Sequence, residues 1–320
     1  TLAFYIPALA KIAQLINEDP KPWVKTLAIY PRNELLRDQF SEVYIEARKF
    51  DKYLKSKGRN VISIGCLFGD VPTSVDYAIN KGWPKGWEQL DGGVKCIYMS
   101  CWSDTCSGDL IWRESNYSKN IEILHCNKCS NKTQKGELRL TRESLTKSMP
   151  DVVFTTAESM NRRLSDPYSR GIFGLGSKAY KPVSLVLLDE VHTYGGTYGA
   201  QIAFLLRRWK YLHKKNVNFI GLSATLIDGV RFFSALTGIP EKWVVEMTPE
   251  EHEMEEEGME YMLAARGDPV SQVALLSATI QIVMLMMRVL DAPTGTKPFT
   301  SNGIYGTKTF VFADDIDIIN

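Results

Sequence analysis

The stretch LVLLDEVHTYGG, residues 185–196, places two adjacent carboxylates directly after four apolar residues. The apolar run, 185–188, is typical of a strand that is buried on both faces of a parallel sheet. Asp189 and Glu190 stand where this strand ends, and His192 follows two positions after Glu190. Folding gives no reason to place two like charges side by side there. The pattern therefore indicates a bound cation, with an acidic surface turn as the alternative.

Short apolar runs separated by helical patterns predict an α/β fold in which helices cover both faces of a parallel sheet. Five runs predict strands, at 26–31, 61–69, 151–156, 184–188 and 217–225. Residues 33–50 carry apolar side chains at helical spacing and predict the crossover helix after the first strand. Ligands of such sheets bind beyond the carboxyl ends of the strands, which is where Asp189 and Glu190 lie.

The composition limits the partners and the compartment. A length of 320 residues fits one large domain with an insertion, or one domain and part of a second. The net charge is +1, so any basic surface for nucleic acid must be local. The most apolar run, 280–290, is too short to cross a membrane and predicts a buried, Met-rich helix. No secretory segment opens the chain, and we expect a cytoplasmic protein without a membrane partner.

A second strand end carries Ser223, Ala224 and Thr225. Two such strand ends suit ATP hydrolysis: Asp189 would hold Mg²⁺ through its water shell, because Mg²⁺ prefers oxygen ligands. Glu190 would orient and deprotonate the attacking water. A second Ser-Ala-Thr triplet, 277–279, lies inside an apolar run of helical length, and we predict that it has no catalytic role.

These motifs resemble those of the superfamily 2 helicases and translocases. DEVH at 189–192 is similar to the DExH motif, and SAT at 223–225 is similar to motif III. Three further stretches resemble motif Ia, motif Ib and motif IV of the second RecA-like domain: YPRNELLRDQ at 30–39, TTAES at 155–159 and TFVFADDID at 309–317. Together with DEVHTYGGTYGAQ and a cysteine-rich insertion, they look most like bacterial YprA-like helicases, whose relatives serve in anti-phage systems such as DISARM and Druantia.

The resemblance implies a RecA-like fold, the cofactors ATP and Mg²⁺, and a set of catalytic residues. These are Asp189, Glu190, His192, Ser223 and Thr225. The phosphate-binding loop of the family ends in Gly-Lys-Thr, and the opening TLAFYIPAL is similar to the residues that follow its lysine. Thr1 would then be a Mg²⁺ ligand. Since the lysine and the late arginines of the second domain are not in the sequence, we expect a fragment of an enzyme that binds ATP poorly as given.

The resemblance also implies a nucleic-acid surface, for DNA more than RNA, at two strand ends. Its members are Arg32, Asn33, Thr155, Thr156 and Glu158, which match family positions that contact the sugar–phosphate backbone. Hydroxyl groups at strand ends are suitable phosphate ligands on physical grounds. A second interpretation, compatible with the first, is that Thr156 and Glu158 cap a helix that begins near Ser159. The most basic stretch, 207–215, indicates a solvated helix face.

Five of the six cysteines fall between residues 96 and 129, which suggests a metal rather than disulfides. The pairs Cys101/Cys106 and Cys126/Cys129 are close to a zinc ribbon, in which each pair forms a knuckle around Zn²⁺. The first pair is wider than the usual knuckle, so Cys96 or His125 stays open as a replacement ligand. An iron–sulfur cluster and free thiols are the alternatives to zinc. Cys66, inside a predicted strand, is interpreted as a buried free thiol.

We predict a first RecA-like helicase domain at 1–247 with a cysteine-rich, zinc-ribbon-like insertion at 92–147. An acidic linker and connecting helix, 248–300, lead to the beginning of a second RecA-like domain at 301–320. The predicted function is an ATP-dependent helicase or translocase that works with a protein partner in anti-phage defence or DNA repair. An RNA helicase and a nucleic-acid-binding scaffold without turnover are the competing hypotheses. Asp189 and Glu190 argue against the scaffold, since an inactive ATPase needs no adjacent unshielded carboxylates.

Overall fold

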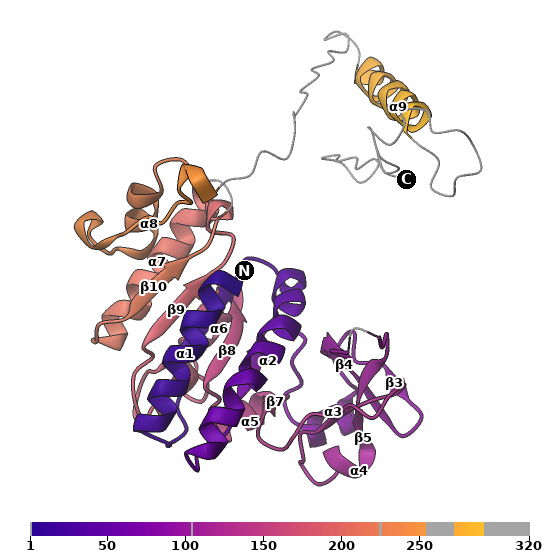
Figure 1. The fold of residues 1–320 in the computed structure, drawn as a ribbon, viewed down its shortest axis with the longest axis vertical. Coiled ribbons are helices and arrows are strands. Elements are labelled where there is room, and N and C mark those ends of the chain that lie inside the picture. Colours follow the sequence, from indigo (N-terminus) through magenta and orange to yellow (C-terminus); the bar gives the residue numbers. More distant parts are fainter. Residues whose placement is uncertain (1, 104, 224–225, 254–271, 291–320) are drawn as a thin grey trace. The chain divides into compact units, whose positions relative to one another are not determined.

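The computed structural model describes residues 2–103, 105–223, 226–253 and 272–290. The chain forms two compact units, Thr1–Met247 and Thr248–Asn320. The first unit contains the sheet and every predicted site residue that the structure describes (Figure 1).

Six parallel strands form the main sheet in the order β10-β9-β1-β8-β2-β7. Their bounds are β1 (Thr26–Tyr30), β2 (Ile64–Leu67), β7 (Leu138–Arg139), β8 (Val152–Thr156), β9 (Leu185–Leu188) and β10 (Asn218–Gly221). Five of them lie inside the five stretches predicted from apolar runs, and helices cover both faces, which confirms the predicted α/β fold. The sixth, β7, is too short to produce a recognisable pattern in the sequence.

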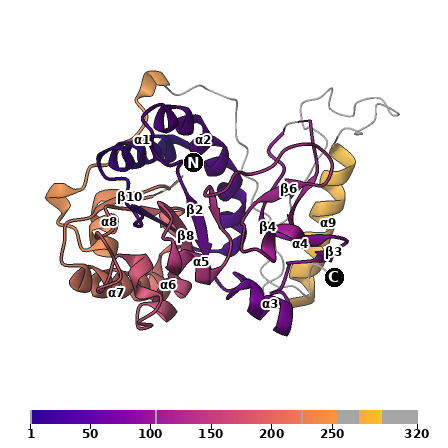
Figure 2. The ribbon, with the colours of Figure 1, turned by 90° about the horizontal axis from the view of Figure 1, so that it is seen from below.

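Alternate residues of each strand enter two apolar cores, one on each face of the sheet. Ala28 and Tyr30 pack into the first core, and Leu27 and Ile29 into the second. The covering helices are α1 (Leu2–Glu18) and α2 (Asn33–Ser56) on the first face, and α6 (Ala157–Arg163) and α7 (Gly196–His213) on the second. Figure 2 shows these two pairs on opposite sides of the sheet. Burial on both faces explains why the strands are continuously apolar.

The cysteine-rich insertion folds into a second, antiparallel sheet with the order β3-β4-β5-β6. Its strands are β3 (Gln89–Leu90), β4 (Gly93–Ser100), β5 (Asp109–Arg113) and β6 (Leu124–Cys126), flanked by the helices α3 (Val75–Lys81) and α4 (Glu114–Tyr117). Its buried side chains, including Tyr98, Leu110 and Trp112, belong to the same core as α1 and α2. We call residues 89–126 and the loop that follows them to residue 137 the cysteine module.

The predicted bounds of the insertion, 92–147, differ from the structure at both ends. The antiparallel sheet already begins at Gln89. The chain rejoins the main sheet at β7, where Leu138 pairs with Ile64 of β2, and the helix α5 (Arg142–Lys147) follows. Two-residue strands leave no periodicity from which either boundary could be predicted.

Paired charges fix the end of the cysteine module to α2. Glu137 is buried, accepts a hydrogen bond from the Tyr44 hydroxyl at 2.6 Å, and forms an ion pair with Arg48 at 3.1 Å. Arg48 also pairs with the buried Asp51 at 3.1 Å. Breaking a buried pair leaves an uncompensated charge, so these contacts hold the module against the main sheet.

The second unit contains the helix α9 (Gln272–Val289) and the short turn η4 (Glu251–Glu253). The second Ser-Ala-Thr triplet, 277–279, lies within α9, as predicted. The predicted burial of residues 280–290 is wrong for the side chains that the structure describes, because Met284 and Met287 are 54% and 68% exposed. No described helix combines the length and the hydropathy that a membrane span requires. The proposed motif IV, 309–317, lies outside the described residues.

Candidate functional site

The two adjacent carboxylates after β9 occupy different environments. The Asp189 N–H donates to Ile29 O at 3.3 Å, which continues the strand pairing by one residue and leaves Asp189 only 5% exposed. Glu190 then adopts φ 50° and ψ 47°, a left-handed conformation that is uncommon for any residue but glycine. This turn starts the short helix η2 (Val191–Thr193) and leaves the Glu190 side chain 38% exposed. One carboxylate is therefore buried while its neighbour faces solvent.

Burial raises the pKa of Asp189 above the ordinary value for an aspartate, and the negative charge of Glu190 acts in the same direction. The Glu190 N–H, which donates to Asp189 Oδ1 at 2.9 Å, opposes the shift. Without a cation, the ionised form of this carboxylate is thus unfavourable. An oxygen donor of this kind, held at a strand end, fits the ligand preference of Mg²⁺.

Asp189→Asn is expected to raise the melting temperature of the ligand-free, full-length protein at neutral pH. Asn retains the acceptor for the Glu190 N–H and removes a buried charge. Since the folded pKa of Asp189 lies above its unfolded value, wild-type stability falls as the pH rises from about 4 through the folded pKa. The advantage of the variant should therefore grow with pH in thermal denaturation. An advantage that is equal at all pH values would contradict this assignment of the burial cost.

His192 joins the two strand ends that carry the motifs. Its Nδ1 lies 3.3 Å from Glu190 Oε2 and 3.1 Å from Ser223 Oγ. The backbone fixes the same geometry, because the Val191 N–H donates to Leu222 O at 2.9 Å. The structure thus brings Asp189, Glu190, His192 and Ser223 together at the carboxyl ends of β9 and β10. Thr1 and Thr225, also predicted for this site, lie outside the described residues.

A glycine permits the tight turn after this site. Tyr194 follows η2, and α7 then begins at Gly196. A Cβ on Gly199 would lie 1.8 Å from Tyr194 O, so no other residue fits there without moving the backbone. The spacing of the glycines in GGTYG therefore serves the close packing of α7 against the segment that carries Glu190 and His192.

The residues predicted to contact nucleic acid occupy the ends of β1 and β8, which are neighbouring parallel strands. Arg32 is exposed and precedes α2, and Asn33 is the first residue of that helix. Thr156 accepts a hydrogen bond from the Ser159 N–H at 3.3 Å and so caps α6, which agrees with the capping interpretation. Glu158 is exposed and forms an ion pair with Arg162 at 2.5 Å.

The Thr155 side chain does not reach the surface predicted to contact nucleic acid. It is fully buried, and its hydroxyl donates to Leu67 O at 2.7 Å inside the sheet. The prediction of a backbone contact for Thr155 is therefore not supported by its position. The alternation of strand side chains, which places Thr155 and Thr156 on opposite faces, accounts for the difference.

The basic stretch 207–215 is mostly exposed, and three of its side chains also contact neighbouring helices. Arg207 donates to Ala235 O at 2.7 Å, and Lys210 donates to Thr237 O at 3.1 Å. Both acceptors are carbonyls at the carboxyl end of α8 (Gly229–Thr237), where cations are favourable. Arg208 binds Asn161 Oδ1 of α6 at 2.7 Å. Arg207 and Arg208 are exposed, which agrees with the expected solvated face, and Lys210 is half-buried. Their acceptors on helices distant in sequence could not be predicted.

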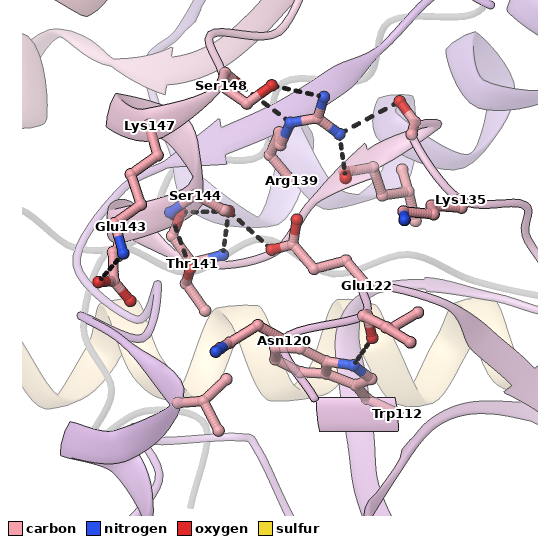
Figure 3. Close-up of a pocket in the computed structure, with 14 residues that line it drawn as sticks. Trp112, Asn120, Glu122, Lys135, Arg139, Thr141, Glu143, Ser144, Lys147 and Ser148 are labelled. Atoms are coloured by element: carbon pink, nitrogen blue, oxygen red, sulfur yellow. Dashed lines mark hydrogen bonds and ion pairs between the residues drawn. The ribbon is translucent and has the colours of Figure 1, made fainter. Parts of the chain in front are cut away.

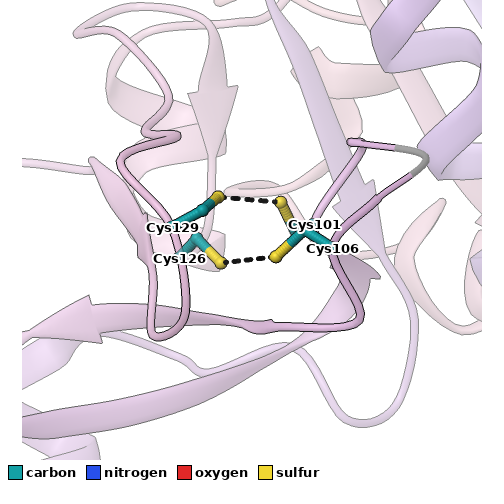
Figure 4. Close-up of side chains that lie close together, drawn as sticks. All are labelled: Cys101, Cys106, Cys126 and Cys129. Carbon is teal, nitrogen blue, oxygen red and sulfur yellow. Dashed lines mark hydrogen bonds between the residues drawn. The ribbon is translucent and has the colours of Figure 1, made fainter.

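Four cysteine side chains converge in the cysteine module (Figure 4). The Sγ atoms of Cys101 and Cys129 are 3.6 Å apart, those of Cys106 and Cys126 are 3.7 Å apart, and all four lie within 4.8 Å of one another. A tetrahedral Zn²⁺ with bonds of about 2.3 Å separates its sulfur ligands by about 3.8 Å. The four thiols thus fit a single tetrahedral ion, and at these separations they are not joined as disulfides.

Neither alternative ligand belongs to this cluster. Cys96 is buried on β4, and the His125 Nε2 atom contacts Asn116 Nδ2 at 3.0 Å. A turn between Cys101 and Cys106 brings these two cysteines together despite their wide spacing. In this turn the Cys106 N–H donates to Ser103 O at 2.9 Å. The structure therefore assigns the cluster to the four cysteines that the spacing predicted.

Backbone groups around the cluster favour a thiolate. Burial raises the pKa of Cys126, but the N–H groups of Lys128 and Cys129 and the thiols of Cys129 and Cys106 together lower that pKa to about 7. The neighbouring thiols act in the opposite direction on Cys129, whose pKa is raised to about 12. The Lys128 N–H lies 3.4 Å from Cys126 Sγ. A Cβ on Gly108 would lie 2.4 Å from the same sulfur, so the close approach of the two knuckles requires glycine. Since the thiolate is the metal-binding form of cysteine, this surrounding suits a metal ligand.

A cavity of about 330 Å³ lies where the cysteine module meets β7 and α5 (Figure 3). The buried Glu122 carboxylate on its wall accepts hydrogen bonds from Ser144 Oγ and the Leu140 N–H, both at 2.7 Å. Arg139 donates to Ser148 O at 2.8 Å, and Lys147 pairs with Glu143 at 2.6 Å. Because these polar groups already have protein partners, we interpret the cavity as a joint between the two sheets. No motif in the sequence indicated it.

Comparisons with known proteins agree with this site. Residues 111–233 match the DEAD/DEAH box helicase family. The chain is 25% identical over 284 residues to the Druantia protein DruE of Escherichia coli, which covers 75% of this chain and 15% of that protein. It is 27% identical over 103 residues to the ATP-dependent helicase hrq1 of Schizosaccharomyces pombe, with 31% and 9% covered.

A solved structure of the Mycobacterium smegmatis helicase Lhr, bound to ssDNA and AMP-PNP, aligns with 69% of this chain and 19% of its own, at 19% identity and a TM-score of 0.41. The chain thus spans less than a fifth of the length of each of these proteins. The segment that matches the DEAD/DEAH box helicase family, residues 111–233, includes Asp189, Glu190, His192 and Ser223.

Proposed function

We propose that this chain is the ATP-hydrolysing core of a YprA-like helicase or translocase that acts on DNA rather than RNA. The observation that carries the proposal is the contact of His192 with both Glu190 and Ser223, which links the ends of β9 and β10. Through this contact, a change in the position of Glu190 during hydrolysis would alter the end of β10. An acidic surface turn without a catalytic role would not need such a contact.

The side chains have distinct tasks in this proposal. Mg²⁺·ATP, when bound, supplies the phosphoanhydride and the charge that shields the carboxylates. Asp189, buried and rigid, holds the hydrated cation. Glu190, partly exposed, accepts a proton from the attacking water. His192 keeps the Glu190 carboxylate oriented. Ser223 is coupled to that orientation because its Oγ atom contacts the same His192 Nδ1 atom.

The proposal is tested by the ATPase activity of the full-length protein with single- and double-stranded DNA and RNA as stimulants. We expect DNA-stimulated turnover that exceeds the RNA-stimulated rate. Stimulation by RNA alone would favour the RNA helicase, and nucleic-acid binding with no turnover would favour the scaffold.

For the nucleic-acid surface, we propose that the strand-end residues Arg32, Asn33, Thr156 and Glu158 follow one sugar–phosphate backbone. Arg32 and Glu158 are exposed, Asn33 is partly exposed, and Thr156 is 8% exposed. Tyr30 and Thr156 are paired across β1 and β8, so the residues that follow them lie at the same sheet edge. This edge is next to the end of β9, one strand away from the carboxylates.

Arg32→Ala is expected to weaken binding about equally for all base sequences, because phosphate contacts carry no sequence information. The slope of log affinity against log salt concentration should fall by about one, measured by fluorescence anisotropy of the full-length protein. Arg231→Ala is the control, since Arg231 is an exposed arginine on α8, a helix that packs against α7 and carries none of the proposed nucleic-acid residues. If Arg32→Ala leaves affinity and salt slope as they are in Arg231→Ala, the surface lies elsewhere.

For the cysteine module, we propose one structural Zn²⁺ held by Cys101, Cys106, Cys126 and Cys129. Sulfur atoms that all lie within 4.8 Å of one another enclose one ion more readily than a cluster of several irons. The similarity to DruE supports a role in anti-phage defence with a protein partner in the cytoplasm, and DNA repair is the alternative pathway.

A further inference from the structure

The antiparallel sheet of the cysteine module has one face in the core and one face toward solvent. Four side chains of β5 and β6 form the core face: Leu110, Trp112, Leu124 and Cys126. Successive side chains of a strand point to opposite faces, so the residues that alternate with these four lie on the other face. Ile111 pairs with His125 there, and Arg113 is the diagonal neighbour of His125 on β5. Arg113 is exposed and His125 is half-buried, so this face borders solvent.

The loop after β6 adds a lysine to the same face. Lys132 pairs with His125 in an isolated antiparallel bridge. The Thr133 N–H donates to Leu124 O at 3.0 Å, which holds this bridge beside β6. Because paired side chains lie on the same face, the exposed Lys132 stands next to His125. We call this solvent-facing side the outer face, and its residues include Lys95, Asp109, Ile111, Arg113, His125 and Lys132.

The cations of the outer face are unequally neutralised. Lys95 is paired with Asp109, since its Nζ lies 3.0 Å from Asp109 Oδ1. Arg113 and Lys132 form no ion pair with a residue in the described ranges, and this includes Glu114, the first residue of α4. Cations that lie close together on one face of a sheet repel each other. A bound anion would remove this cost.

His125 supplies a hydrogen-bond donor between the two cations. Its Nε2 atom lies 3.0 Å from Asn116 Nδ2. The Asn116 Nδ2 atom also donates to Ile123 O at 3.4 Å, so it is the donor and the His125 Nε2 atom accepts. Burial lowers the pKa of His125, and the charges of Arg113 and Lys132 lower it further, so the ring is neutral at neutral pH. In this ring the proton is on Nδ1, which can donate to an anion.

We propose that the outer face of the cysteine module binds the sugar–phosphate backbone of nucleic acid through Arg113, His125 and Lys132. These donors come from three neighbouring segments about 4.8 Å apart, a rigid row that suits a regular polyanion. None of the paired residues on this face is Phe, Tyr or Trp, so it offers no platform for base stacking and should contact the backbone alone. The inference rests on the proposed function for the choice of polyanion, since an acidic protein segment carries the same charge.

The test compares Lys132→Ala with Lys135→Ala in the full-length protein, by fluorescence anisotropy with labelled single-stranded DNA. Lys135 is the matched control, because it is an exposed lysine of the same loop that lines the cavity beside Trp112, on the core side of the module. Lys132→Ala should weaken binding about tenfold and lower the salt slope by about one, whereas Lys135→Ala should bind like wild type. Arg113→Ala should have the same effect as Lys132→Ala, and two unrelated base sequences should lose affinity equally.

Lys132→Arg separates charge from packing. It keeps the cation and should bind DNA like wild type, so a loss equal to that of Lys132→Ala would overturn the inference. Equal affinity and salt slope in Lys132→Ala, Arg113→Ala and Lys135→Ala would also overturn it. If the alanine variants keep DNA affinity but lose binding of labelled polyglutamate, the face belongs to an acidic protein partner and the inference is wrong.

ATP turnover of the wild-type protein reports separately on the proposed function. A wild type that binds DNA without hydrolysing ATP would refute that function. The comparison of Lys132 with Lys135 needs no ATP and would still decide whether the outer face binds nucleic acid.

Discussion

Glu190→Gln is expected to lower the ATP turnover of the full-length protein at least about a hundredfold while nucleotide binding persists. The amide cannot accept the proton of the attacking water. Asp189, the proposed cation ligand, is unchanged, and glutamine has the size of glutamate, so the turn at residue 190 and the approach of His192 should be kept. Phosphate release measures the turnover, and fluorescence of a labelled nucleotide measures the binding.

Glu143→Gln is the control for this experiment. Glu143 lies on α5, where it pairs with Lys147, away from the strand ends of β9 and β10. Its variant should hydrolyse ATP at the wild-type rate. Turnover in Glu190→Gln within a few-fold of that rate would show that another group accepts the proton.

Cys126→Ser is expected to release the metal and to lower the stability of the whole first unit. Wild-type protein should contain about one zinc per chain and be colourless, since a Cys₄ site takes one ion. Metal binding is part of the folding free energy of such sites, so its loss should lower the free energy of unfolding by about 5 kcal/mol or more. Elemental analysis and thermal denaturation measure the two effects.

Cys96→Ser distinguishes a ligand from a buried cysteine of the same module. Cys96 is outside the four-sulfur cluster, so its variant should keep one zinc even if its stability falls. A brown protein with stoichiometric iron would contradict the zinc assignment. Full zinc content in Cys126→Ser would show that the ligand set is different.

The sequence predicted the sheet well because its longer strands consist mostly of apolar residues, and β9 does so throughout. The same signal fails for β7, whose two residues are too few to show a pattern. The predicted site residues include four that the structure gathers at β9 and β10, because strand-end motifs depend on local sequence. Contacts between distant elements escaped prediction: the capping of α8 by Arg207 and Lys210, and the burial of the Thr155 hydroxyl against Leu67.

The cysteine cluster was likewise predicted only in part. Spacing identified the four cysteines, yet it left Cys96 and His125 open, because a sequence does not reveal which strand face a side chain occupies. The environment of Tyr194 could not be predicted either. Its hydroxyl is buried without a hydrogen-bond partner among the described residues, and this can be recognised only from the positions of the surrounding atoms.

The helix α2 shares one apolar core with the cysteine module, so it connects the module to the main sheet. At about 1.5 Å per residue, its 24 residues span about 36 Å. One end begins beside Arg32, and its fourth and fifth turns carry Tyr44 and Arg48, which bind Glu137. A force applied to the cysteine module would therefore reach, through α2, the sheet edge where nucleic acid is proposed to bind. Loss of the proposed zinc should then weaken nucleic-acid binding as well.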